Sequence, residues 1–143
     1  MRLGRSPFFK LLLLVNLTAR PFARRYEKQH RLALPEWRVM LVLAETPGLS
    51  SAEIAERLGL DKMAVSRAVR GLERRGRLER RVDPRDGRRW ALHLSPAGRA
   101  LFRKIEPSAL VREAALFGVL TAAERARLET ILEKLVAGAR RLP

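Results

Sequence analysis

The chain reads SSAEIAERLGLDKMAVSRAVRGLERRG from Ser50 to Gly76, and this stretch decides its fold. Ser50 and Glu53 have the spacing of a capping box, which predicts that a short helix begins here. Gly59 can adopt the left-handed backbone of a tight turn, and Asp61 can cap a second, longer helix that Gly76 ends. A short helix, a turn and a longer helix are the parts of a helix-turn-helix.

The second helix of this motif has an apolar face and a basic face. Val65, Ala68, Val69 and Leu72 recur at the spacing of one buried stripe. Long hydrogen-bond donors occupy the other sides, as a recognition helix requires, because its first turns enter the major groove of DNA. The alternative is the solvated face of a protein that is rich in arginine. From these two helices we predict DNA contacts by Ser51, Lys62, Met63, Ser66, Arg67, Arg70 and Arg74.

A β-hairpin is predicted next. Two segments that partly alternate apolar and polar residues, 77–82 and 89–94, flank the turn-forming stretch Asp-Pro-Arg-Asp-Gly-Arg. Residues 62–89 hold eleven basic and four acidic residues, an excess that favours phosphate contacts. Arg85 at the tip suits the minor groove, and Asp83 can orient it through a charge-assisted hydrogen bond. An ordinary surface turn is the alternative. The predicted contacts of this hairpin are Asp83, Arg85, Arg88 and Arg89.

Helical patterns flank this centre on both sides. Apolar residues recur at three- and four-residue steps before it, and Pro35 opens an almost wholly apolar helix. After the hairpin, Ser95-Pro96 and a second capping box at Thr121 each begin a helix. Pro21 and Pro107 lie inside these patterns and are expected to bend or interrupt them. The expected helices span residues 7–32, 35–45, 50–58 and 62–75, with two more beginning at 96 and 121.

Two motifs resemble those of one known family. The stretch 50–70 is similar to the helix-turn-helix of MarR-type regulators, and Asp83, Arg85 and Arg89 fit their wing pattern Asp-x-Arg-x-x-x-Arg. Residues 92–98 resemble the family's exit from the wing into the next helix. The resemblance covers roughly residues 32 to 105. It implies a mainly α fold with a small β-hairpin wing, in which helices from both chain ends interlock with a second copy.

On this basis we expect three segments and a homodimer. Residues 1–34 form an N-terminal dimerisation helix, residues 35–95 a winged helix-turn-helix that binds DNA, and residues 96–143 the C-terminal dimerisation helices. A two-fold dimer places two recognition helices about one turn of DNA apart, where they read a pseudo-palindromic operator in double-stranded DNA. A monomer that folds both end segments onto its own core is the alternative.

The resemblance also implies an effector ligand. Many MarR-type proteins respond to small aromatic or phenolic acids bound between the dimerisation helices and the DNA-binding part. We therefore expect a repressor that such an acid releases from DNA. For Tyr26 and Trp37 core packing is the alternative, and for Arg38 it is an intramolecular ion pair or a side chain that reaches out to solvent. The candidate ligand-binding residues are Asn16, Arg20, Tyr26, His30, Trp37 and Arg38.

The amino-acid composition limits which functions and partners remain for this chain. A formal net charge of +15 favours nucleic acid as the partner, and a non-specific architectural DNA-binding protein without a ligand is the rival interpretation. The chain has no cysteine and two histidines and shows no catalytic motif, so we expect no metal, no cofactor and no enzyme. The apolar run at residues 8–17 contains Lys10 and Asn16 and is too short to span a bilayer. We therefore expect no membrane partner and a cytoplasmic location.

Overall fold

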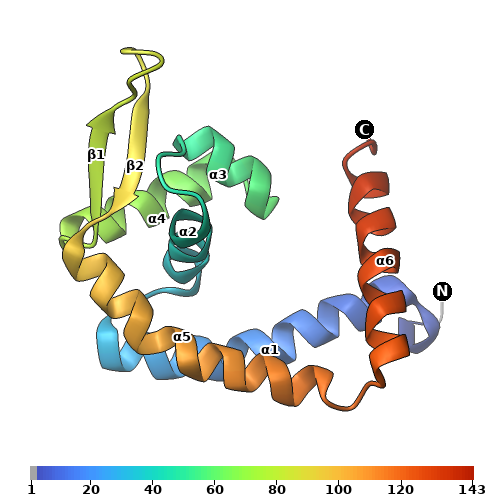
Figure 1. Ribbon diagram of the computed structural model, residues 1–143. Coiled ribbons are helices and arrows are strands. Elements are labelled where there is room, and N and C mark those ends of the chain that lie inside the picture. The colour runs from blue at the N-terminus through green and yellow to red at the C-terminus, as the bar shows by residue number, and fades with distance from the viewer. Residues whose placement is uncertain (1–2) are drawn as a thin grey trace. The chain divides into compact units, whose positions relative to one another are not determined.

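The computed structural model describes residues 3–143 and shows a mainly helical fold with a two-stranded hairpin (Figure 1). Residues 1 and 2, where the predicted N-terminal dimerisation segment begins, lie outside the described residues. The predicted fold class is confirmed. The elements are the 3-10 turn η1 (Leu3–Arg5), α1 (Pro7–His30), α2 (Leu34–Glu45), α3 (Ser51–Leu58), α4 (Lys62–Arg74), β1 (Leu78–Val82), β2 (Trp90–Leu94), α5 (Pro96–Phe117) and α6 (Ala122–Ala139).

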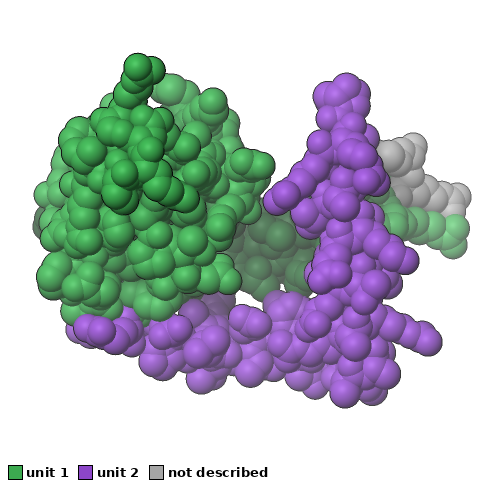
Figure 2. Space-filling view, turned by 45° about the horizontal axis from the view of Figure 1, so that its top comes forward, with its two compact units in different colours: residues 1–102 green, residues 103–143 purple. Residues whose placement is uncertain are grey.

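The chain divides into two compact units, residues 1–102 and 103–143 (Figure 2). The first unit contains α1 to α4, the hairpin and the first turns of α5. The second contains the rest of α5 and α6. None of the helices within residues 3–143 combines the length and the hydropathy that crossing a membrane requires.

The helix-turn-helix forms as its sequence predicts. The Ser50 hydroxyl accepts a hydrogen bond from the backbone N–H of Glu53 at 3.2 Å, and the Glu53 carboxylate accepts one from the backbone N–H of Ser50 at 2.9 Å. Gly59 ends α3 with a φ of 64°, a left-handed conformation that glycine adopts without strain. Asp61 caps α4 by accepting a 2.8 Å hydrogen bond from the N–H of Ala64. These local bonds satisfy backbone N–H groups at the starts of α3 and α4 and so fix where each helix begins.

The core of the first unit forms around α2. This helix packs against α3, α4 and β2, and it buries an apolar side chain in each of its turns. The predicted stripe of α4 faces this core, since Val65, Val69 and Leu72 have no exposed surface. Burying one such side chain stabilises a fold by roughly 1.5–3 kcal/mol. The stripe therefore holds α4 firmly and leaves its basic face outward.

The hairpin is antiparallel, with Leu78 opposite Leu94 at its base and Val82 opposite Trp90 at its outer end. A third short segment joins it, because the N–H of Leu92 donates to the carbonyl of Leu49 at 2.9 Å. The loop before α3 is thereby hydrogen-bonded to the free edge of β2. The hairpin and the helix-turn-helix are parts of one packed body.

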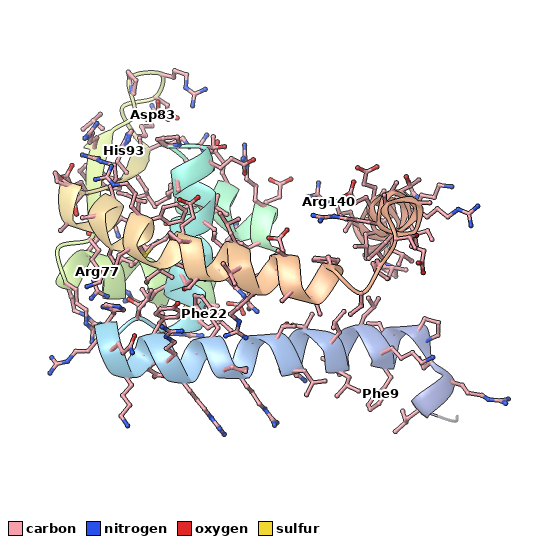
Figure 3. The ribbon with its side chains drawn as sticks, turned by 60° about the horizontal axis from the view of Figure 1, so that its bottom comes forward. Phe9, Phe22, Arg77, Asp83, His93 and Arg140 are labelled. Carbon is pink, nitrogen blue, oxygen red and sulfur yellow. The ribbon has the colours of Figure 1, made fainter. Side chains whose placement is uncertain are left out.

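Arg77 lies where several elements of the first unit meet (Figure 3). Its guanidinium donates to the carbonyls of His30 and Arg31 at the end of α1. Its own carbonyl accepts a 3.1 Å hydrogen bond from the N–H of Ser95, just before α5. Arg77 thus joins the ends of α1 and α4 to the start of α5.

Neither interior proline ends its helix. α1 continues through Pro21 and α5 through Pro107, so the expected interruptions are absent. A helical proline loses one hydrogen bond and crowds the preceding turn, but packing can offset this cost. Directly after Pro21, the Phe22 ring is buried and lies 4.4 Å from the Tyr26 ring and 5.3 Å from the Trp37 ring, between centroids.

Candidate nucleic-acid interface

α4 presents a long basic face to solvent. Lys62, Arg67 and Arg70 are exposed, and Met63 at the start of the helix keeps 64% of its surface accessible. The amino-terminal end of a helix carries a partial positive charge, which favours nearby phosphates. The structure thus places the predicted recognition residues on one accessible surface. Of the other predicted contacts in these two helices, Arg74 is exposed, and Ser51 and Ser66 are half-buried.

The wing tip is organised by Asp83. Its carboxylate accepts a 2.8 Å hydrogen bond from the backbone N–H of Arg85 and lies 3.6 Å from the Arg85 Nε. That N–H lowers the pKa of the Asp83 carboxyl, and the charges of Arg85 and Arg89 add to the effect. Asp83 is buried, whereas the Arg85 side chain is 78% exposed. The Asp83 carboxylate is thus fixed at the root of the wing tip, and the Arg85 guanidinium beside it projects into solvent, as the sequence predicts.

The other two predicted wing residues differ from each other in their surroundings. Arg88 is exposed, and its backbone N–H donates to Asp86 at 3.0 Å, which shapes the turn. The Arg89 guanidinium instead lies 3.1 Å from the Glu53 carboxylate and 2.7 Å from the Ser50 hydroxyl. A DNA contact by Arg89 stays a prediction, and its observed partners belong to the capping box of α3.

This Arg89 contact ties the wing to the helix-turn-helix. The backbone N–H of Ser50 lowers the pKa of the Glu53 carboxyl, and the Arg89 charge lowers it further. Glu53 therefore stays ionised under most conditions and can serve the cap and the wing together. Sequence reasoning missed this role, because the two segments are 39 residues apart. The second arginine of the wing pattern was the only signal that could have indicated it.

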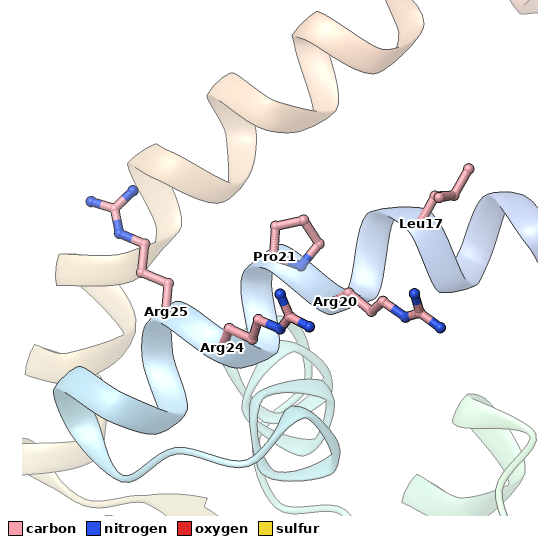
Figure 4. A pocket seen from close by; sticks show the side chains of 5 residues that line it. All are labelled: Leu17, Arg20, Pro21, Arg24 and Arg25. Carbon is pink, nitrogen blue, oxygen red and sulfur yellow. The ribbon is translucent and has the colours of Figure 1, made fainter.

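The candidate ligand residues do not gather at one place. Arg20 is exposed and lines a shallow depression on α1 together with Leu17, Pro21, Arg24 and Arg25 (Figure 4). Asn16 is also exposed, and Arg38 on α2 is half-buried. A role of these three residues in ligand binding stays a prediction.

The aromatic candidates pack into a cluster. Tyr26 and Trp37 are each 4% exposed, and both contact the ring of Phe22. Trp37 also stacks on Phe102 at 5.2 Å, and Tyr26 stacks on half-buried His30 at 6.0 Å, between ring centroids. The packing fits the core role that the sequence left open for Tyr26 and Trp37. For Tyr26 and Trp37 to touch a ligand, the cluster would have to open, whereas half-buried His30 keeps some accessible surface. A role of these three residues in ligand binding stays a prediction.

Sequence reasoning also missed Glu36, a buried carboxylate in α2. One of its oxygens accepts a 2.9 Å hydrogen bond from the backbone N–H of Ala33 and so caps the helix. The other oxygen, Oε2, finds no hydrogen-bond partner among the described residues and lies against Gly71 of α4. The glutamate at the third helical position was the available signal. Within residues 3–143, no group of three or more His, Cys, Asp or Glu side chains could hold a metal ion.

Comparisons with known proteins agree with this geometry. The model of the MarR family matches residues 32–89. An HTH-type transcriptional repressor of Mycobacterium tuberculosis is 32% identical over 130 residues, which are 91% of this chain and 94% of the relative. The homoprotocatechuate degradative operon repressor of Escherichia coli is 25% identical over 126 residues, 88% of this chain and 85% of the relative. The crystal structure of a MarR/EmrR family transcriptional regulator from Acinetobacter sp. ADP1 superposes with a TM-score of 0.91 at 28% identity, covering 99% of this chain and 100% of that one.

Proposed function

The chain belongs to the MarR family of DNA-binding transcription regulators, which are not enzymes, and on this premise we propose that it is a sequence-specific repressor that an aromatic acid releases. The DNA-binding part of this proposal rests on one observation, that two exposed basic surfaces, on α4 and at the wing tip, are each fixed by buried residues. The exposed basic face of α4 is held by a buried stripe, and the exposed Arg85 is held by buried Asp83. A regulator acts where the chromosome lies, so the proposal also places the protein in the cytoplasm.

The proposed functional unit is a homodimer. Support comes from apolar surface that the single chain leaves uncovered on helices of both units. A soluble protein rarely exposes so many large apolar side chains unless a partner covers them. A second copy would also set the spacing of the two recognition helices. On α1, α5 and α6, the exposed large apolar side chains are Phe8, Leu11, Leu12, Leu13, Leu14, Val15 and Leu17 on α1, Leu110 and Val111 on α5, and Ile131, Leu135 and Val136 on α6.

A selection experiment tests the DNA-binding proposal. Immobilised protein is used to enrich duplexes from a random pool, and the enriched sequences are aligned. We expect an inverted repeat whose half-sites lie about one helical turn apart. The net charge of +15 favours the rival, a non-specific architectural protein. A pool that shows no consensus after enrichment would support the rival and refute the repressor.

An aromatic acid is the proposed effector class. The relative from Escherichia coli represses an operon named for the degradation of homoprotocatechuate, a phenolic acid. In this chain, Arg20 offers an accessible guanidinium beside an apolar wall of Leu17 and Pro21, a combination suited to a small aromatic carboxylate. A ligand that binds about tenfold better to a form unable to grip DNA needs about 1.4 kcal/mol of differential affinity.

The effector proposal is tested by titrating a panel of benzoic, phenylacetic and hydroxybenzoic acids into the protein–DNA complex. We expect at least one acid to raise the melting temperature of the protein and to weaken its DNA binding. Arg20→Ala and Arg38→Ala should reduce the response, and Lys28→Ala, an exposed cation on the same helix as Arg20, serves as the control. If no acid changes both quantities, the effector proposal is wrong. If an acid acts equally on all three variants, neither arginine binds it.

A further inference from the structure

The outer end of the wing carries an apolar pair that the proposed contacts leave unused. Trp90 at the start of β2 keeps 51% of its surface exposed, and Val82, directly opposite on β1, keeps 60%. A tryptophan offers one of the largest apolar surfaces of any side chain, so its exposure at this place calls for a physical reason.

The pair lies on the inner face of the hairpin. Side chains alternate along a strand, so Trp90 shares a face with Leu92 and Leu94, which are 1% and 4% exposed. The apolar stripe that packs on the core thus continues outward along the hairpin beyond the point where the core ends. On β1, Leu78 and Val82 follow the same pattern.

The same face looks toward the recognition helix. Arg80 lies between Leu78 and Val82 on β1, and its guanidinium binds Glu73 of α4 at 2.8 Å. When α4 enters a major groove and Arg85 the neighbouring minor groove, the sugar–phosphate strand between these grooves must run past this face.

Charge complementarity selects the occupant. The hairpin from Arg80 to Arg89 carries five arginines and two aspartates, so the pair is set in a strongly basic surface. A polyanion with apolar sugar edges fits this surface better than a typical protein partner, because phosphates can meet the arginines while deoxyribose meets the ring.

We propose that Trp90, backed by Val82, packs against deoxyribose of the DNA strand that passes between α4 and the wing. Trp90 is then a positioning residue that fixes how deeply Arg85 enters the minor groove. This inference rests on the proposed DNA-binding function and adds a contact to it. Because the contact is apolar, it releases no counterion and contributes affinity without adding to the salt dependence.

Fluorescence tests the contact directly, since the chain has two tryptophans. Trp37→Phe leaves Trp90 as the single indole, and Trp90→Phe leaves Trp37, which is 4% exposed, as the matched control. The probes are a duplex selected from a random pool and a mixed-sequence duplex, with binding followed by the anisotropy of a labelled strand. We expect DNA to reduce acrylamide quenching of Trp90 at least about twofold and to leave Trp37 unchanged.

Affinity gives a second readout. Trp90→Ala should weaken binding about tenfold without changing the slope of log affinity against log salt, and Trp90→Phe should retain most of the affinity. Arg85→Ala, by contrast, should reduce the magnitude of that slope by about one. Far-UV circular dichroism of both Trp90 variants checks the fold.

Three results would overturn the inference. Unchanged quenching of Trp90 in a complex that anisotropy shows to be formed would mean that the ring does not touch DNA, although the proposed function stands. Protection of Trp90 that grows with protein concentration in the absence of DNA would assign the pair to a contact between copies. Failure of the wild type to bind either duplex would remove the proposed function itself.

Discussion

Gly98 sets the distance between α5 and the base of the wing, and replacing it with alanine should destabilise the first unit. A Cβ at this position would lie 2.0 Å from the carbonyl oxygen of Arg77 and 2.9 Å from its carbonyl carbon, whereas real Cβ contacts stay above 3.0 Å. The backbone has little freedom to move. The Gly98 N–H donates to the Ser95 hydroxyl at 3.0 Å, and that hydroxyl donates in turn to the carbonyl of Gly76.

The change in the free energy of unfolding caused by Gly98→Ala is the sum of two losses and one gain. Forcing a methyl group into a packed site costs typically about 1–3 kcal/mol. Separating α5 from Arg77 also stretches the hydrogen bond from Ser95 to the Arg77 carbonyl, worth about 0.5–1.5 kcal/mol. Alanine recovers about 1 kcal/mol through its higher helix propensity. The expected net loss is therefore about 0.5–3.5 kcal/mol. A loss of about 2 kcal/mol, in the middle of this range, corresponds to a melting temperature lower by roughly 6–8 °C for a chain of this size.

Thermal unfolding followed by circular dichroism measures this loss at one fixed protein concentration. Two other glycines complete a graded series. At Gly71 the added methyl would meet the Glu36 Oε2 at 2.7 Å, the end of a side chain that can move, so Gly71→Ala should cost less. At Gly138 in α6 nothing lies within 4 Å, so Gly138→Ala should stabilise the protein by up to about 1 kcal/mol. Equal melting temperatures for the Gly98→Ala and Gly138→Ala proteins would show that the Arg77 carbonyl leaves room for a side chain at position 98.

Three further perturbations address the interface. Arg67→Ala should weaken binding to a selected operator by about 1–3 kcal/mol and affect a mixed-sequence duplex less; equal losses on both duplexes would make Arg67 a phosphate contact. Arg85→Ala should lower operator affinity and leave the helical circular dichroism signal unchanged, with Asp83→Ala acting in the same direction more weakly; unaltered affinity at physiological salt would exclude the minor-groove role. Folding lowers the pKa of the Glu53 carboxyl, so the ionised form stabilises the folded chain. This stabilisation is fully present above the pKa that Glu53 has in the unfolded chain, and it is lost as the pH falls through the lower pKa of the folded chain. Between pH 6 and pH 3, urea unfolding should therefore show a larger loss of stability for the wild type than for Glu53→Gln. The difference should be less than about 1 kcal/mol, because the ion pair of Glu53 and Arg89 is partly exposed. Equal losses in the two proteins would contradict a stabilising role of this ion pair.

Local signals in the sequence predicted most of the fold. The capping pair of Ser50 and Glu53 depends on residues three positions apart, and the stripe that includes Val65 and Val69 depends on one helical period, so both could be recognised without a structure. Both predictions are confirmed. A bend or an interruption was expected at Pro21 and at Pro107, and the interruption was wrong at both, because α1 and α5 are continuous. At Pro21 the local rule left out the packing of the neighbouring Phe22 ring.

Contacts between distant segments of the chain could not be predicted in this way. The engagement of Arg89 with the α3 cap depends on how the hairpin folds back, and the burial of Glu36 depends on the approach of α4. For Trp37 the sequence left core packing and ligand contact open, and the aromatic cluster fits the first. Helical periodicity indicates that a side chain faces inward and leaves open which element covers it.

A competition measurement tests whether the protein recognises a specific DNA sequence. A labelled duplex selected from a random pool is held in complex with the wild-type chain at physiological salt, and unlabelled selected and mixed-sequence duplexes compete for it. A sequence-specific regulator should prefer the selected duplex by at least about a thousandfold. The Arg67→Ala protein should show a smaller preference. If both competitors displace the label at similar concentrations, the basic surfaces of α4 and the wing bind DNA only through its charge, and the assignment as a sequence-specific repressor is wrong.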